Sequence, residues 1–307
     1  MKQKFRKTSL NAKSVAHLNV INAIIEDYQA QGYKLTLRQL YYQLVSKNVI
    51  ANNDQEYKKL SRVLTEGRVA GIVDWDSIED RLRRPQNVYT VEDIKDALED
   101  TVTQYRLNRQ RDQNVFVEVL VEKDAISNVL KRVTEKYGVN ILVNRGYGSV
   151  TAMYDAYSRY RSALKYKNID KVVILYIGDH DPSGLDMIRD INARVTEMLD
   201  QDFDGVFEIK PIALTKKQIK QYNPPPNPAK ITDSRSDGYI ALHGASSWEV
   251  DALPPEVLDK ILDDAICNEI DVEQYNKIVS LEAVEKNEIR KIINKFNDTE
   301  SYDEDDE

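Results

Sequence analysis

The stretch VVILYIGDHDPSGLDM, from Val172 to Met187, joins an apolar run to an acidic turn. The run ends at Gly178, and two carboxylates one residue apart, Asp179 and Asp181, follow it before a Pro-Ser-Gly segment that opens a helical pattern. A continuous apolar run of this length is typical of a strand covered on both faces. Because open parallel sheets bind ligands outside the carboxyl ends of their strands, the stretch predicts such a sheet with a site at its edge.

Strand and helix patterns alternate on both sides of this stretch. Apolar, β-prone runs lie at 115–121, 140–144, 171–179 and 206–214, and helical patterns lie between them at 124–138, 149–167 and 183–200. Strands alternating with helices of this length predict a doubly wound parallel α/β sheet. We therefore expect an α/β domain over residues 114–297, with a mixed C-terminal extension.

Residues 1–90 have a different pattern. Helical periodicity appears at 14–30, 36–50 and 55–71, and the short β-prone segment GIVDWD at 71–76 predicts a small strand pair. Three helices followed by a strand pair is the order of a winged helix-turn-helix, in which the third helix reads the DNA groove. We expect a DNA-binding domain at 1–90 and a connecting helix over 91–113.

Charge is unevenly distributed along the chain. The net charge is −8, but residues 1–112 hold 19 Lys and Arg against 15 Asp and Glu. The segment 298–307 has no basic residue and is expected to be a disordered acidic tail. A basic cluster on and after the third helix supplies candidate contacts to double-stranded DNA, with a solvated basic face as the alternative; its members are Lys58, Lys59, Arg62, Arg68, Arg81, Arg83 and Arg84.

The acidic residues at the strand ends predict a metal site. Side chains at i and i+2 of extended backbone point the same way, so Asp179 and Asp181 should aim together. Glu122 closes the run at 115–121 and joins them if the two strands are neighbours. Three carboxylates in one pocket favour Mg²⁺, or Mn²⁺, and phosphoryl chemistry. The alternative is that Asp179 caps a turn and Asp181 stabilises the following helix N-terminus.

Other chemistries find little support. The single Cys267 allows no internal disulfide, and the three histidines, His17, His180 and His243, lack metal-ligand spacing. The segment SWEVDAL could place Glu249 and Asp251 near the site, although packing of its Trp is the simpler interpretation. No apolar run approaches the roughly 20 residues of a membrane helix, and none follows the basic N-terminus, so we expect a cytoplasmic protein without membrane contact.

Three motifs of the α/β region carry a resemblance to a known family. VEKDAI (121–126) and GDHDPSGLDM (178–187) resemble TOPRIM motifs, and NRGYGS (144–149) resembles the Gly-rich turn between them. Their form is similar to that of the topoisomerase VI A subunit and the related meiotic double-strand-break protein, above all the compact stand-alone Mini-A relatives of mobile elements. The resemblance implies a TOPRIM domain after a winged helix, with Glu122, Asp179 and Asp181 as metal ligands and Lys123 and Asp186 beside them.

A second motif matches upstream. The sequence RQLYY at 38–42 resembles that family's Arg-Asp-(Ile/Leu)-(Phe/Tyr)-Tyr motif, with Gln39 in place of the Asp. The resemblance implies that Tyr42 is the nucleophile. Arg38, one helical turn earlier, would stabilise the phenolate or hold the phosphate. Core packing is the alternative for both tyrosines; Tyr41 fits the apolar stripe, which leaves Tyr42 freer.

Together the motifs imply a Mg²⁺-dependent, type IIB topoisomerase-like enzyme that cleaves DNA strands by tyrosine transesterification. The family acts as a homodimer, and modules on one chain are not expected to meet easily, which favours a two-fold partner. The chain has no phosphate-cradling loop of its own, so a separate ATPase subunit stays possible. A hydrolytic TOPRIM nuclease and a non-catalytic DNA-binding protein are the alternatives.

Overall fold

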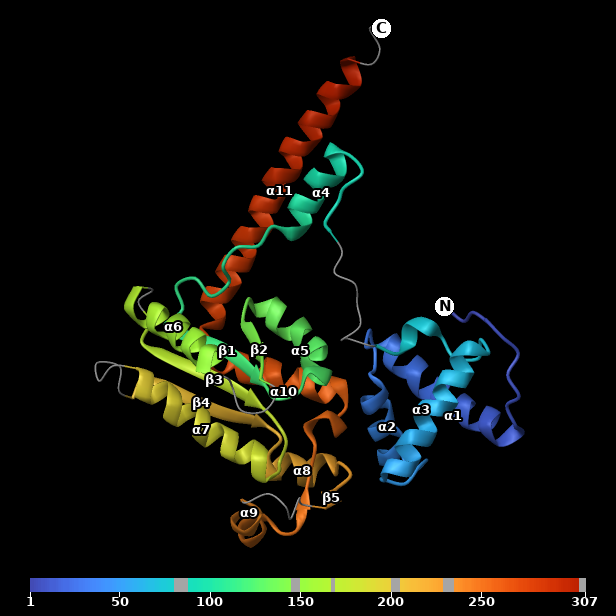
Figure 1. The fold of residues 1–307 in the computed structure, drawn as a ribbon. Coiled ribbons are helices and arrows are strands. Elements are labelled where there is room, and N and C mark those ends of the chain that lie inside the picture. Colours follow the sequence, from blue (N-terminus) through green and yellow to red (C-terminus); the bar gives the residue numbers. More distant parts are fainter. Residues whose placement is uncertain (80–87, 145–149, 167–168, 200–204, 229–234, 304–307) are drawn as a thin grey trace.

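The computed structural model describes residues 1–79, 88–144, 150–166, 169–199, 205–228 and 235–303. These residues form three parts that Figure 1 separates clearly: a lobe of three helices, a sheet domain and a long arm of two helices that projects from the sheet domain. Among the described helices, none combines the length and the apolar character that crossing a membrane requires.

Four parallel strands in the order β2-β1-β3-β4 form the sheet. They are β1 (Val115–Val121), β2 (Asn140–Val143), β3 (Lys171–Ile177) and β4 (Phe207–Ala213). β1 and β3 pair in register along their whole length, from Val115↔Lys171 to Val121↔Ile177. The predicted α/β class and all four predicted strands are confirmed.

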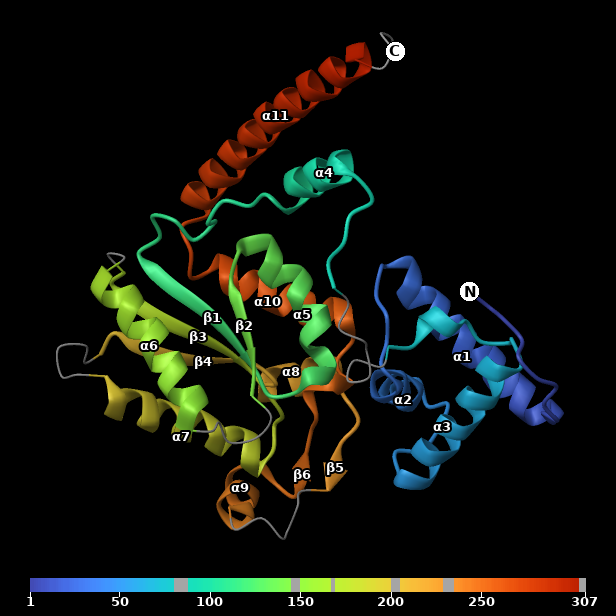
Figure 2. The same ribbon diagram turned by 45° about the horizontal axis from the view of Figure 1, so that its top comes forward.

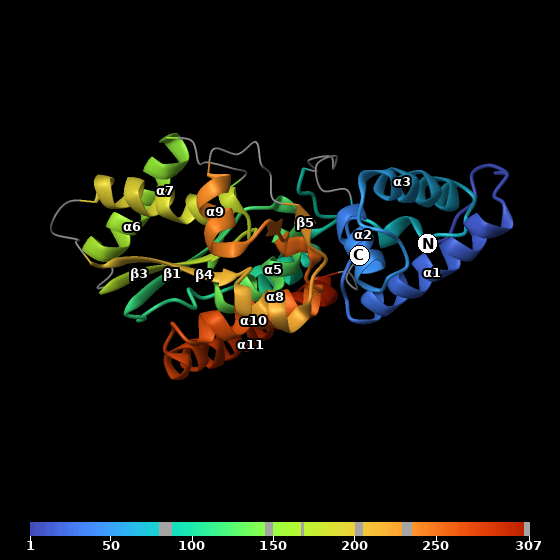
Figure 3. The same ribbon diagram turned by 90° about the horizontal axis from the view of Figure 1, so that it is seen from below.

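Helices cover both faces of the sheet, as Figure 3 shows. On one face lie α5 (Asp124–Tyr137) and α10 (Pro255–Cys267), and on the other lie α6 (Val150–Tyr166) and α7 (Pro182–Met198). Alternate residues of β3 enter two separate cores: Val173, Leu175 and Ile177 face one, whereas Val172, Ile174 and Tyr176 face the other. Burial on both faces explains why this strand is a continuous apolar run.

The topology defines where a ligand would bind. The chain leaves β1 into α5 on one face and leaves β3 into α7 on the other, so the carboxyl ends of β1 and β3 flank the topological switch point. Short elements that follow β4 border this edge (Figure 2); they are α8 (Lys216–Tyr222), β5 (Asn227–Pro228), α9 (Ser236–His243), β6 (Ser246–Ser247) and the 3-10 helix η3 (Val250–Ala252).

The lobe contains α1 (Ala12–Ala30), α2 (Leu37–Ser46) and α3 (Asp54–Val69), which confirms the three predicted helices. Thr36 begins α2 with a capping box: its side chain accepts from the Gln39 N–H, and the Gln39 side chain accepts from the Thr36 N–H. This cap fixes where α2 starts.

The strand pair predicted at 71–76 is not formed. The described residues after α3 make a 3-10 helix, η1 (Trp75–Ser77), and isolated bridges join Leu35 to Ile78 and Lys4 to Ala70. The Asp74 side chain accepts from the Asp76 N–H and tightens the chain into a turn, which competes with extended pairing. The lobe is a three-helix unit without a wing in its described part.

The arm pairs α4 (Ile94–Gln104) with α11 (Val272–Asp303). Arg109 binds Glu282 at 2.8 Å and anchors the base of the arm. The connecting helix predicted over 91–113 is thus shorter than expected. The helix α11 runs into the predicted acidic tail as far as Asp303, and residues 304–307 are outside the described residues, so the disorder expected from residue 298 stays a prediction.

Candidate active site

The predicted carboxylates meet at the switch point. Glu122 follows β1 directly, and Asp179 and Asp181 follow β3. Oε2 of Glu122 accepts a hydrogen bond from the backbone N–H of Asp179 at 3.0 Å. The expectation that two adjoining strand ends bring Glu122 to the aspartate pair is therefore confirmed.

Asp179 and Asp181 have different local roles. Oδ1 of Asp179 accepts from the Val250 N–H at 2.9 Å and the side chain is buried. Asp181 is the N-cap of α7, with Oδ1 accepting from the Gly184 N–H at 2.7 Å. The capping role considered as an alternative for Asp181 is thus real, and it occupies only one carboxylate oxygen. His180 between them turns away to Tyr239.

A lysine lies among the acidic residues. The Nζ atom of Lys123 is 2.8 Å from Asp179 Oδ2, 2.8 Å from Glu249 Oε2 and 3.0 Å from Asp251 Oδ1. The sequence did not assign Glu249 or Asp251 to the site, and their placement comes from the η3 segment, whose Val250 N–H binds Asp179. Asp186 instead binds Arg189 and Arg235, and the predicted Gly-rich turn at 145–149 is outside the described residues.

The carboxylate oxygens of these residues are the ligand type that a hard divalent cation prefers, but their side chains are not grouped around one point. In the described part of the chain, no group of three or more His, Cys, Asp or Glu side chains is arranged to hold a metal. The Lys123 ammonium lies against one oxygen of Asp179. Glu122 and Asp181 each use one oxygen in the bonds above, Oε2 and Oδ1. Mg²⁺ commonly needs only one or two carboxylates, with water and phosphate oxygens completing its shell.

Burial controls the charge of this cluster. It raises the pKa of Asp179 to about 6, and the carboxylates of Glu122 and Asp251 act in the same direction, whereas the Lys123 ammonium lowers it. The nearby Tyr176 hydroxyl donates to Glu122 Oε2 at 3.4 Å. The site therefore gathers several carboxylates around the Lys123 ammonium, which partly offsets their charge.

The helix α2 presents Arg38 and Tyr42 to this edge. The guanidinium of Arg38 pairs with Glu249, and its Nε is 3.0 Å from Asp251 Oδ2. It also lies over the Tyr42 ring, 5.8 Å from the ring centre. Arg38 thus links the proposed nucleophile to the same two carboxylates that hold Lys123.

Tyr42 is more enclosed than the sequence suggested. Tyr41 and Tyr42 are 5% and 4% exposed, so neither is the freer residue. Burial raises the pKa of Tyr42, as does the Asp251 carboxylate, whereas the charges of Arg38 and Lys123 lower it. A protonated hydroxyl beside two cations is the resting state that this environment favours.

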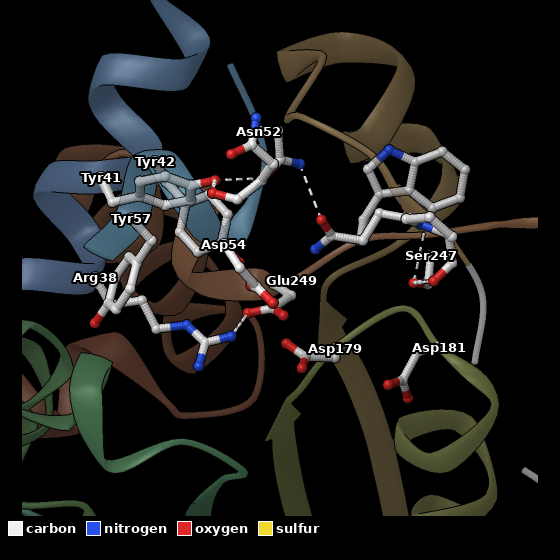
Figure 4. A pocket seen from close by; sticks show the side chains of 14 residues that line it. Arg38, Tyr41, Tyr42, Asn52, Asp54, Tyr57, Asp179, Asp181, Ser247 and Glu249 are labelled. Carbon is white, nitrogen blue, oxygen red and sulfur yellow. Dashed lines mark hydrogen bonds and ion pairs between the residues drawn. The ribbon is translucent and has the colours of Figure 1, made fainter. Parts of the chain in front are cut away.

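Tyr42 and the aspartates line one pocket of about 540 Å³, shown in Figure 4. Its wall on the lobe side is aromatic, and its floor at the sheet edge carries Asp179 and Asp181. The expectation that modules on one chain cannot easily meet is therefore wrong. Direct contacts hold the lobe in place: the Arg38 ion pairs, and a hydrogen bond of 2.8 Å from the Tyr33 hydroxyl to Asp259.

The predicted DNA contacts divide into three groups. Lys58, Lys59 and Arg62 are exposed on α3, although Lys59 pairs with Glu56 at 3.1 Å. Arg68 is committed to the lobe itself, since it donates to the Trp75 carbonyl at 2.8 Å and stacks on the Trp75 ring at 4.7 Å. The remaining candidates, Arg81, Arg83 and Arg84, lie outside the described residues.

No protein-family model and no curated protein matches this chain. The geometry at the switch point is therefore what bears on function. A tyrosine and an arginine from one helix face a set of carboxylates across a single pocket.

Proposed function

We propose that this chain is a DNA-cleaving enzyme of the topoisomerase VI A type, with Tyr42 as its nucleophile. The observation that carries the proposal is the shared pocket, in which Tyr42 and Arg38 face Asp179 and Asp181 at the switch point of a parallel sheet. The resemblance of RQLYY, VEKDAI and GDHD to the family motifs supports it. The order of a helical lobe followed by a TOPRIM-like parallel sheet is part of the same proposal.

In the proposed reaction, the Tyr42 oxygen attacks a backbone phosphorus and the bond to the 3′ oxygen breaks. The phenolic proton is lost, the 3′ oxygen gains a proton, and the product is a phosphotyrosine bond to a 5′ end. Arg38 is placed to bind the phosphate, because a guanidinium binds phosphate oxygens as readily as the carboxylates that it now holds. Its charge also favours the Tyr42 phenolate.

Glu122, Asp179 and Asp181 would hold Mg²⁺, or Mn²⁺, which when bound neutralises charge on the phosphate. Binding of the metal would require the ion pair between Lys123 and Asp179 to break. Lys123 keeps Glu249 and Asp251 as partners, so its charge stays compensated after the release.

Each chain supplies one Tyr42 and therefore cuts one strand. Cleavage of both strands requires two copies, and this stoichiometry is now the argument for a homodimer. The exposed Lys58, Lys59 and Arg62 of α3 are the proposed surface for double-stranded DNA. Strand passage would need a separate ATPase subunit.

The test is incubation with supercoiled plasmid and Mg²⁺ or Mn²⁺, followed by denaturing separation of protein-linked DNA. We expect 5′ ends bound to the protein. Tyr42→Phe should abolish the adduct, and so should the double variant Asp179→Ala with Asp181→Ala. Tyr41→Phe is the matched control, because Tyr41 lines the same pocket and bonds Asn52.

One observation favours the alternative of a hydrolytic nuclease. The Tyr42 hydroxyl is buried and its pKa is raised, which disfavours it as a nucleophile relative to a metal-bound water. The nuclease predicts that Tyr42→Phe still cuts DNA with free ends. The transesterase predicts that Tyr42→Phe forms neither protein-linked DNA nor DNA with free cut ends.

A further inference from the structure

We propose that Arg38 and Lys123 form a subsite for a backbone phosphate of duplex DNA, and that the Glu249 carboxylate occupies this subsite until DNA displaces it. The inference rests on the proposed function for the identity of the ligand. It adds a second phosphate-binding cation, Lys123, and a competitor within the chain. The three residues come from different segments: Arg38 from α2, Lys123 from the start of α5 and Glu249 from the start of η3.

One carboxylate oxygen of Glu249 joins the two cations. Its Oε2 atom lies 2.8 Å from Nζ of Lys123 and also pairs with Nη2 of Arg38. Figure 4 shows the pairing with Arg38 in the pocket that Tyr42 and Asp179 also line. A phosphate oxygen in the same place would contact both cations, because phosphate and carboxylate oxygens accept the same charge-assisted hydrogen bonds.

A second carboxylate, that of Asp251, holds the same two cations from a fully buried position. Its Oδ1 atom is 3.0 Å from Lys123 Nζ, and its Oδ2 atom is 3.0 Å from Arg38 Nε. The Asp251 side chain is 0% exposed, whereas the Glu249 side chain is 23% exposed and lines the pocket. Asp251 therefore fixes the spacing of the two cations, and Glu249 is the partner that a ligand in the pocket would meet.

Departure of the Glu249 side chain would break few contacts. Glu249 is the N-cap residue of η3, but its side chain makes no capping hydrogen bond. Among the described residues, its carboxylate bonds to Arg38 and Lys123 alone. An incoming phosphate replaces one anion by another, so neither cation is left without a counter-charge. The competition weakens DNA binding, and removing the competitor should strengthen it.

The subsite lies where the proposed reaction needs a phosphate. The Arg38 guanidinium is 5.8 Å from the centre of the Tyr42 ring, and Nζ of Lys123 is 2.8 Å from Oδ2 of Asp179. A phosphate that these two cations hold is therefore next to both the proposed nucleophile and a proposed metal ligand.

Glu249→Gln removes the competing charge with almost no change in size. We expect this variant to bind inorganic phosphate about 10-fold more tightly than the wild type in metal-free buffer, as for the loss of a competitor that makes one charge-assisted hydrogen bond. Isothermal titration calorimetry measures this affinity, and fluorescence anisotropy should show a similar gain for a short DNA duplex. Glu249→Ala, which also removes the amide, should show the same gain. Glu256→Gln is the matched control, because Glu256 is exposed at the start of α10 and loses the same charge.

Arg38→Gln in the Glu249→Gln background should return the phosphate affinity to the wild-type level or below, which locates the gain at this subsite. The inference is overturned by equal affinities in the wild type and both Glu249 variants, by an equal gain in Glu256→Gln, or by a gain that survives in the double variant. A gain for inorganic phosphate without a gain for the duplex would overturn DNA as the ligand. Tighter binding of both, with no protein-linked DNA from the wild type, would overturn the proposed cleavage alone.

Discussion

The ammonium of Lys123 lies 2.8 Å from Oδ2 of Asp179, the carboxylate that the proposed mechanism assigns to the metal. The same nitrogen contacts Glu249 and Asp251. Buried carboxylates repel one another, and an internal cation removes much of that repulsion. The chain therefore carries its own counter-ion at the site, and a divalent cation has to compete with it for Asp179.

Replacing Lys123 by methionine should expose this competition. Lys123→Met leaves buried carboxylates without their cation, and we expect the free energy of unfolding in metal-free buffer to fall by about 3–5 kcal/mol. Added Mg²⁺ should raise the melting temperature of the variant more than that of the wild type, since it takes over the vacated charge. Differential scanning calorimetry with and without Mg²⁺ measures both effects.

Lys136→Met is the control for that experiment. Lys136 forms an ion pair of 2.7 Å with Asp263 and is 52% exposed, so its removal should matter little and should not respond to Mg²⁺. Equal responses of the two variants to Mg²⁺ would contradict a cation site at Asp179.

Replacing Asp179 by asparagine should raise the free energy of unfolding at neutral pH. Its folded pKa of about 6 lies above the ordinary value near 4, so the folded state binds the proton more tightly than the unfolded state. Its contribution to stability therefore declines as pH rises through 4 to 6, by up to about 3 kcal/mol. Asp179→Asn should exceed the wild type in urea unfolding at pH 7 in chelator. The two should converge near pH 4, and a constant gap would refute the linkage.

Glu282 should behave in the opposite way. Arg109 lowers the pKa of this buried carboxyl to about 2 through a 2.8 Å ion pair. Its stabilisation is present above the unfolded pKa near 4 and is lost as pH falls through 4 toward 2. Glu282→Gln should cost about 2–3 kcal/mol of unfolding free energy at pH 7 and almost nothing at pH 2. For Asp263→Asn, at an exposed ion pair, the loss of unfolding free energy should differ much less between pH 7 and pH 2.

The fold could be read from the sequence because its signals are local. The run at 172–177 is apolar throughout since both faces of β3 are covered, and the helical periodicity at 36–50 contains α2. The acidic residues after β1 and β3 were found by the same logic, as parallel strands that neighbour each other end at one edge. Each of these predictions needed only a short window of residues.

The remaining features depend on distant contacts. Lys123, Asp179 and Asp251 meet only because three segments converge, and SWEVDAL has no periodicity that announces it. The missing strand pair at 71–76 instead has a local cause, because the Asp74 side chain tightens the chain into a turn and Trp75 packs on Arg68. The closeness of Tyr42 to the carboxylates follows from docking of the lobe, which Arg38 and Tyr33 secure across more than 200 residues of sequence.

The exposed basic residues of α3 should control DNA affinity. We expect the double variant Lys58→Ala with Arg62→Ala to weaken duplex binding uniformly across sequences. For every phosphate that the variant no longer neutralises, the slope of log affinity against log salt should become shallower by about 1. Fluorescence anisotropy of a labelled duplex between about 50 and 200 mM salt provides the slope.

Arg68→Ala separates charge from packing in that experiment. Arg68 carries the same charge on the same helix, but its guanidinium is held by the carbonyl and ring of Trp75. We expect this variant to keep the salt slope of the wild type and to unfold at a lower temperature. Lys260→Ala, 74% exposed on α10, should change neither quantity. A slope that falls in Arg68→Ala and not in the double variant would place the DNA on the other side of α3.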